Sequence, residues 1–142
     1  MKRLFLLASL SLSCVALADA DPVEGMYQLS TDGTSKAVKV GEKGKVVIAI
    51  SAKAGAHVSG DAPMKIELSS KELKADKEKL TLADAATKKS DKHEIEEARF
   101  EVPFSAAKAG KANLEAKCTY FICTDKVCAR QQKTIQFPVD VN

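Results

Sequence analysis

The chain carries the stretch NLEAKCTYFICTDKVCARQQKTIQFPVDV from Asn113 to Val141, and the interpretation of its fold starts there. Within this stretch, residues 134–141 alternate apolar and polar side chains with a period of two. Such alternation places one side of a β-strand on a core and the other side in water. We therefore predict a β-hairpin in which residues 124–127 join two long strands.

Pairing Cys123 with Cys128 fixes the register of this predicted hairpin. The cross-strand pairs on its apolar side are then Leu114 with Phe137 and Ala116 with Ile135. The same side carries Cys118, Tyr120 and Ile122, and the opposite side carries the paired cysteines with Lys117, Thr119, Phe121, Arg130 and Gln132. A register chosen from the cysteines alone thus also aligns the apolar residues, and this alignment is independent support for it.

The length of the turn leaves two geometries open for the cysteine pair. If Asp125 and Lys126 form a two-residue turn, Cys123 and Cys128 are a non-hydrogen-bonded pair with Cα atoms about 4.5 Å apart. A four-residue loop places these atoms about 5.5 Å apart instead. Either distance allows a disulfide without backbone movement. Cys118 is an odd number of residues from Cys123 and points into the core, so we expect it to be a free, buried thiol.

Other segments alternate in the same way or are rich in β-branched residues. They are Lys45–Ile50, Met64–Leu68, Arg99–Phe104 and Thr134–Val141. Glycine, proline and aspartate fall between the predicted strands at a spacing typical of β-sandwiches, so we predict an all-β sandwich of about seven strands. Pro103 and Pro138 predict edge strands or bulges at their positions, because proline donates no hydrogen bond to a neighbouring strand.

The segment Ser70–Glu97 differs from the rest because it is rich in lysine, aspartate, alanine and glutamate. Leu73, Leu80 and Leu82 mark a strand or a short helix within it. The residues from Ala85 onward are charged and almost free of apolar side chains, which favours a long, exposed and mobile loop without a ligand.

Composition limits the class of protein. The chain has 142 residues, of which 45% are hydrophobic, and this length and apolar fraction are ordinary for one globular domain. Its 22 lysines and arginines are interleaved with 19 aspartates and glutamates. Because no basic stripe emerges that could follow a phosphate backbone, we expect no nucleic-acid partner.

Residues 1–20 resemble a secretory signal peptide. A cationic start precedes an apolar run from Leu4 to Ala18, and small residues follow at the positions that signal peptidase requires. We expect residues 21–142 to form the mature protein, a single exported, periplasmic domain without a transmembrane span. The alternative is a lipoprotein anchored through an acylated Cys14. The leucine usual three positions before such a cysteine is absent, which favours the ordinary signal peptide.

Export places the cysteines in an oxidising compartment, where disulfides form and persist. A disulfide between Cys123 and Cys128 closes a short ring, lies near a strand end, and has Lys126 and Arg130 close enough in sequence to lower a thiol pKa. These features favour a reactive pair. Many exported β domains nevertheless close a hairpin with an inert disulfide, so a structural role stays open from chemistry alone.

The segment Tyr120–Cys128, with the sequence YFICTDKVC, resembles the disulfide segment of the N-terminal periplasmic domain of the thiol:disulfide interchange protein DsbD. The segment Gly55–Pro63 is similar to a Gly-x-His…Pro stretch in many members of that family. The resemblance implies an immunoglobulin-like fold and a redox pair formed by Cys123 and Cys128, with Tyr120 packed beneath it. It also implies two partners, periplasmic thioredoxin-like proteins and a membrane thiol reductase.

The chain departs from the family in two respects. Relatives often have prolines after the second cysteine, where this chain has Ala129-Arg130-Gln131. The loop that shields the disulfide in the family carries aromatic residues, and Ser70–Glu97 has none. The alternative function is therefore a non-catalytic immunoglobulin-like binding or assembly module with a structural disulfide.

Other chemistries have weaker support. A zinc or copper site would need the three cysteines together with His57 or His93, but strand parity sends Cys118 to the opposite face. We therefore expect no metal and no other cofactor. Each histidine alone is typical of a solvated or hydrogen-bonded residue. The sequence contains no nucleophile-elbow serine and no glycine-rich phosphate loop.

Overall fold

Strands make up most of the computed structural model, which describes residues 20–91 and 93–142. The strands are β1 (Tyr27–Ser30), β2 (Ala37–Val38), β3 (Lys43–Ala52), β4 (His57–Ser59), β5 (Lys65–Ser69), β6 (Leu73–Ala75), β7 (Lys79–Leu80), β8 (Thr87–Asp91), β9 (Glu94–Ala106), β10 (Gly110–Cys123) and β11 (Cys128–Val141). A single 3₁₀ turn within these residues, η1, covers Leu82–Asp84. No helix in the described part of the chain has the length and hydrophobicity needed to cross a bilayer. The predicted signal peptide, apart from its last residue, lies outside the described residues, as does Cys14.

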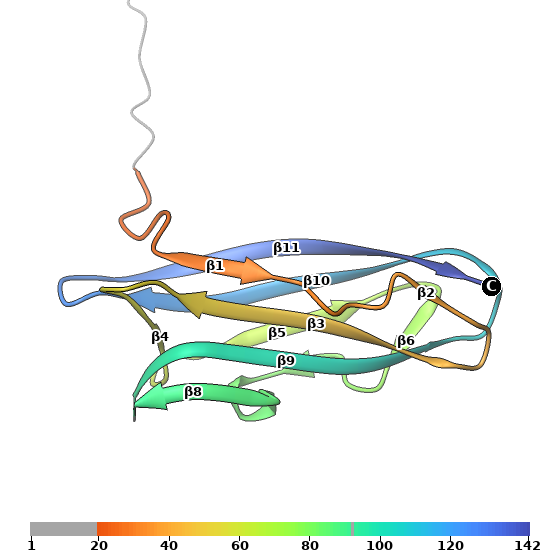
Figure 1. Cartoon of the computed structure of the whole chain (residues 1–142). Coiled ribbons are helices and arrows are strands. Elements are labelled where there is room, and N and C mark those ends of the chain that lie inside the picture. The colour runs from red at the N-terminus through yellow and green to blue at the C-terminus, as the bar shows by residue number, and fades with distance from the viewer. Residues whose placement is uncertain (1–19, 92) are drawn as a thin grey trace, which may run out of the picture.

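The strands form the two layers of an immunoglobulin-like β-sandwich (Figure 1). One layer contains β1, β3 and β9, with β6 and β8 paired to β9. The other contains β10 and β11, with β5 paired to β10, β7 to β5, and β2 to the end of β11. β4 pairs with both β9 and β10 and so connects the layers. The predicted all-β sandwich is confirmed: seven of the described strands have four or more residues, and the other four have two or three.

The core lies between the layers and is built from alternate residues of the long strands. β10 contributes Leu114, Ala116, Cys118, Tyr120 and Ile122, each at most 1% exposed. Phe100 and Phe104 of β9 and Ile48 and Ile50 of β3 are buried to the same extent. Burying a large apolar side chain stabilises the fold by about 1.5–3 kcal/mol, so the alternation in the sequence selects which face of each strand turns inward.

Within the segment Ser70–Glu97, the part from Ala85 onward is mostly exposed, as predicted, but is not a loop. The whole segment contains β6, β7, η1, β8 and the beginning of β9, and β8 pairs antiparallel with β9. Leu73, Leu80 and Ile95 are each at most 6% exposed, while most of the charged residues between them face solvent. Short strands at the border of a sheet need only these few apolar anchors, so a solvated strand has the composition of a loop. The strand or short helix expected at Leu73, Leu80 and Leu82 is confirmed.

The two prolines within strands have different settings. Pro138 lies on β11, where β2 pairs only with Asp140 and Val141, so the prediction of an edge strand is confirmed there. Pro103 lies on β9, between β3 and β6, and the same prediction is wrong for it. In an antiparallel strand the N–H and C=O of one residue point to the same neighbour. The Pro103 carbonyl faces β6 and accepts a hydrogen bond from Asp76 N–H, just beyond the end of that strand. The position of the missing N–H also faces β6, where the β6–β9 pairing has ended, so no sheet hydrogen bond is lost.

Candidate functional site

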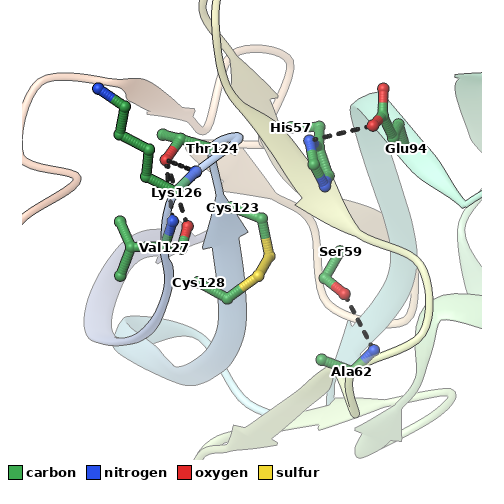
Figure 2. The surroundings of a disulfide bond; sticks show 9 residues. All are labelled: His57, Ser59, Ala62, Glu94, Cys123, Thr124, Lys126, Val127 and Cys128. Carbon is green, nitrogen blue, oxygen red and sulfur yellow. Dashed lines mark hydrogen bonds and ion pairs between the residues drawn. A yellow bond between two sulfur atoms is a disulfide. The ribbon is translucent and has the colours of Figure 1, made fainter.

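A disulfide joins Cys123 and Cys128 at the tip of the β10–β11 hairpin (Figure 2). The two Cα atoms lie 4.0 Å apart. Thr124 N–H donates to the Val127 carbonyl at 2.8 Å, and Thr124 Oγ1 accepts hydrogen bonds from the N–H groups of Lys126 and Val127. These bonds close a tight turn at Asp125–Lys126, so the two-residue turn is the geometry that the chain adopts.

The predicted register of the hairpin is confirmed along its whole length. β10 pairs with β11 from Gly110 opposite Val141 to Cys123 opposite Cys128. Leu114 lies opposite Phe137 and Ala116 lies opposite Ile135, as the cysteine pairing requires. The cysteine pair therefore sits at the end of a continuous antiparallel ladder.

The two sulfur-bearing residues differ sharply in exposure. Cys123 is 2% exposed, whereas Cys128 is an exposed residue. The position of each strand in the sheet causes this difference. At this end β10 is flanked by β4 and β11, while no strand among the described residues pairs with the outer side of β11. A thiol of another protein can therefore approach Cys128 directly, but not Cys123.

The two cations predicted to support the pair, Lys126 and Arg130, lie close in sequence to the exposed Cys128. Lys126 is exposed at the turn, and its side chain extends away from the sulfur atoms (Figure 2). Arg130 is exposed and lies opposite the half-buried Phe121 in the ladder. Because Arg130 is two residues from Cys128 on the same strand, it projects from the same face. A role for either cation in stabilising a thiolate stays a prediction.

Tyr120 lies on the core side of β10, beneath the face that carries the disulfide. Its ring packs edge-on against Tyr27, with ring centroids 5.6 Å apart. The Tyr27 hydroxyl donates a 3.0 Å hydrogen bond to Gln131 Oε1, and Gln131 is itself 4% exposed. The Tyr120 hydroxyl is buried and has no hydrogen-bond partner among the described residues. Burial raises the pKa of Tyr120 above its ordinary range, and the neighbouring Tyr27 hydroxyl adds to this shift.

We expect Tyr120→Phe to stabilise the fold by about 1 kcal/mol, because it removes a buried hydroxyl that has lost its water and gained no partner. Denaturant unfolding of the oxidised protein measures the change. Tyr27→Phe is the matched control and should be destabilising, since it removes the hydrogen bond to Gln131. A loss of stability in Tyr120→Phe as large as that in the control would contradict the prediction.

Cys118 is a free cysteine and is fully buried on the core side of the same strand. Burial raises the pKa of its thiol from 9.0 to about 12. A thiol in this setting is inert at neutral pH, because the reactive species is the thiolate.

The stretch Gly55–Pro63, which carries part of the family resemblance, lies directly beside the disulfide. His57 of β4 is the register partner of Cys123, and Val58 is the partner of Ile122. Gly55 has a φ of +85°, a conformation that glycine adopts without strain, in the turn that brings the chain into β4. Ser59 Oγ accepts a 3.0 Å hydrogen bond from Ala62 N–H in the turn that follows. The sequence alone did not place His57 at the site, although the resemblance had singled out its segment.

A shallow hollow of about 310 Å³ opens between the hairpin tip and β4. Its lining consists of Gly55, Ala56, His57, Glu94, Thr124 and Asp125. A larger hollow of about 570 Å³ contains no cysteine; its lining includes Thr31–Lys36, at the far end of the hairpin. Among residues 20–91 and 93–142, no three histidine, cysteine or acidic side chains are grouped closely enough to hold a metal ion.

Comparison with known proteins yields similarity of fold only. No protein-family model matches the chain, and neither does any curated protein. A conjugative transposon lipoprotein from Bacteroides eggerthii is 12% identical, with a TM-score of 0.45, over 81% of this chain and 97% of that one. Domains 4 and 5 of the S-layer protein SbsC are 12% identical, with a TM-score of 0.43, over 80% of this chain; the chain spans 50% of that structure. The reduced N-terminal domain of Neisseria meningitidis DsbD is 14% identical, with a TM-score of 0.36, over 85% and 90% of the two chains.

Proposed function

We propose that this protein is an exported thiol:disulfide exchange module that acts through Cys123 and Cys128. The observation that carries the proposal is the pairing of an exposed Cys128 with a Cys123 that is 2% exposed. Exchange between proteins requires one sulfur that a partner can attack and a second sulfur that leaves. The difference in exposure assigns these roles, with Cys128 attacked and Cys123 leaving.

In this reaction the protein accepts two electrons from a dithiol of the membrane thiol reductase, and thioredoxin-like proteins receive them in the reverse sequence. A partner thiolate attacks Cys128 Sγ, a new intermolecular disulfide forms, and the bond to Cys123 breaks with its electron pair on Cys123 Sγ. The second thiolate of the partner then attacks the partner's first sulfur in the mixed disulfide, and Cys128 leaves as a thiolate. The partner ends as a disulfide, and this protein ends as a dithiol. The reverse sequence passes the electrons onward.

The small contribution that this bond makes to stability supports a role in exchange. The cysteines are separated by only five positions, so the bond removes little entropy from the unfolded chain. The ladder between β10 and β11 continues from this pair as far as Gly110 and Val141, so the hairpin is held without the bond. A purely structural disulfide would constrain the fold more if it joined distant segments.

The setting proposed for this function is the periplasm. Residues 1–20 serve as the signal peptide, and residues 21–142 form the single mature domain. The partners are periplasmic thioredoxin-like proteins on one side and a membrane thiol reductase on the other, as the resemblance to the DsbD domain implies.

We expect the Cys123–Cys128 bond to have a reduction potential above about −300 mV, because a bond meant for exchange must lie within reach of thioredoxin-like dithiols. Equilibration of the purified protein with graded dithiothreitol or glutathione buffers, followed by thiol trapping and mass spectrometry, measures this potential. Reduced thioredoxin in place of the small thiols tests access by a protein. A potential well below this value, together with no reaction with thioredoxin, would assign the bond to a non-catalytic binding or assembly module.

A further inference from the structure

His57 is the ionisable side chain that the fold brings directly beside Cys123. The two residues are paired across β4 and β10, and opposite residues in an antiparallel pair project from the same face with Cβ atoms about 4.5–5.5 Å apart. The next pair, Val58 with Ile122, is fully buried, which places His57 and Cys123 together on the outer face. Figure 2 shows the imidazole beside Cys123.

The orientation of the His57 imidazole leaves its Nε2 atom free to exchange a proton. His57 Nδ1 faces the carboxylate of Glu94 on β9 at 3.9 Å, and Nε2 is directed away from that carboxylate (Figure 2). No hydrogen bond to Nε2 occurs within the residues that the structure describes. The His57 side chain is 25% exposed, so the ring is partly sheltered yet can exchange protons with solvent.

The charged groups around His57 are mostly acidic. Glu94 and Glu96 of β9, Asp125 of the hairpin turn and Lys53 of the preceding loop line the hollows that contain it. The hollows beside His57 thus carry three carboxylates and one ammonium, of which Glu94 lies 3.9 Å from Nδ1, and an excess of negative charge favours an imidazolium. On β10 the ring faces Cys123, which carries no charge while the disulfide is intact.

Cys123 needs a proton when the disulfide opens. Its residue is 2% exposed, and a thiolate in such a site loses most of its hydration. The Lys126 side chain extends away from both sulfur atoms (Figure 2), so it is not positioned to donate a proton to Cys123. His57 is the titratable side chain in register with this sulfur.

We propose that His57 is the proton donor and acceptor for Cys123 in thiol:disulfide exchange, an inference that rests on the function proposed above. When a partner thiolate attacks Cys128 and the bond to Cys123 breaks, the electron pair goes to Cys123 Sγ. The proton on His57 Nε2 moves to that sulfur and leaves a neutral imidazole. In the reverse direction the neutral imidazole removes the proton from the Cys123 thiol as its sulfur attacks the mixed disulfide on Cys128. The Glu94 carboxylate, 3.9 Å from Nδ1, favours the protonated ring electrostatically.

The reverse step can be measured without a protein partner. Reduced protein is mixed with 5,5′-dithiobis(2-nitrobenzoate) in a stopped-flow instrument from pH 5.5 to 9.5. The first thionitrobenzoate is released when the exposed Cys128 is labelled, and the second when Cys123 closes the disulfide. The rate of the second release reports deprotonation and attack by Cys123.

We expect His57→Asn to slow this second release about 100-fold at pH 7, a usual magnitude for loss of a general base. The difference between the wild-type and variant rates should shrink as the pH rises, because hydroxide then removes the proton from the Cys123 thiol without help from the imidazole. His57→Gln should behave as His57→Asn does. His93→Asn is the matched control, because His93 is an exposed histidine paired with Asp61, and it should match wild type.

Equal closure rates in wild type and in both His57 variants across this pH range would overturn the proposal. Circular dichroism of each variant, and the disulfide that it forms on oxidation, show whether the fold is retained. A wild-type disulfide that reduced thioredoxin cannot open would count against the exchange function, whereas the closure rates judge His57 alone. The two failures are therefore distinguishable.

Discussion

Cys123→Ala protein is expected to react through Cys128 about 1,000-fold faster than Cys128→Ala protein reacts through Cys123. Cys128 is exposed on an outer strand, so its thiol is available in the folded state. Cys123 is 2% exposed between β4 and β11, so a reagent reaches it only after the hairpin opens locally. A thousandfold difference corresponds to an opening free energy of about 4 kcal/mol, which is ordinary for a sub-global opening.

Alkylation with a maleimide at fixed pH, followed by intact-mass analysis, measures the two rates. Cys118 is present in both variants and is fully buried, so it is the internal control and should stay unlabelled in each. A thioredoxin that lacks its resolving cysteine and carries thionitrobenzoate on the remaining one should form a lasting mixed disulfide, with release of thionitrobenzoate, with Cys123→Ala only. Similar labelling rates at the two positions would contradict the assignment of Cys128 as the sulfur that partners attack.

The hairpin could be predicted from the sequence because its evidence is local. Residues 134–141 alternate regularly and the two strands are joined by only four residues, so one cysteine pair is enough to set the register. The buried positions of Cys118 and Tyr120 follow from strand parity alone. Neither inference depends on where the rest of the chain goes.

The unequal exposure of the two cysteines could not be predicted in the same way. Strand parity placed both Cys123 and Cys128 on the polar face, and the sequence gives no sign that they differ. The difference arises because β4 pairs with β10 at Cys123 and leaves β11 as an outer strand. The position of His57 has the same origin, since its partner on β10 is distant in the sequence.

The strand β8, in the part of the segment from Ala85 onward, is hidden in the sequence for a related physical reason. Its residues, Thr87–Asp91, include no apolar side chain and so show no alternation. Backbone pairing with β9 orders them instead. Backbone pairing does not depend on which side chains a strand carries, so the composition of a charged strand at a sheet border resembles that of a loop.

Alkaline pH should destabilise the protein through Cys118. Burial raises the pKa of this thiol from 9.0 to about 12, so the folded state keeps its proton where the unfolded state loses it. Below pH 9 both states are protonated and the thiol has no effect on the pH dependence. Between pH 9 and 12 the unfolded state binds fewer protons, and the free energy of unfolding falls by about 1.4 kcal/mol per pH unit. At pH 10.5 the loss attributable to Cys118 is about 2 kcal/mol.

The variant Cys118→Ala isolates this loss from other alkaline effects. Denaturant unfolding at pH 7 should show the variant less stable than wild type by about 1 kcal/mol, because a buried sulfur has been removed. At pH 10.5 the order should reverse, since the variant lacks the thiol that ionises on unfolding. Tyr120 has a pKa raised in the same direction, partly by Cys118 itself, so both proteins are also compared in a Tyr120→Phe background, which removes its contribution. A stability difference that stays the same from pH 7 to pH 10.5 would contradict the prediction. It would mean that the Cys118 thiol ionises as readily in the folded protein as in the unfolded chain, and therefore that Cys118 is not tightly packed between the layers.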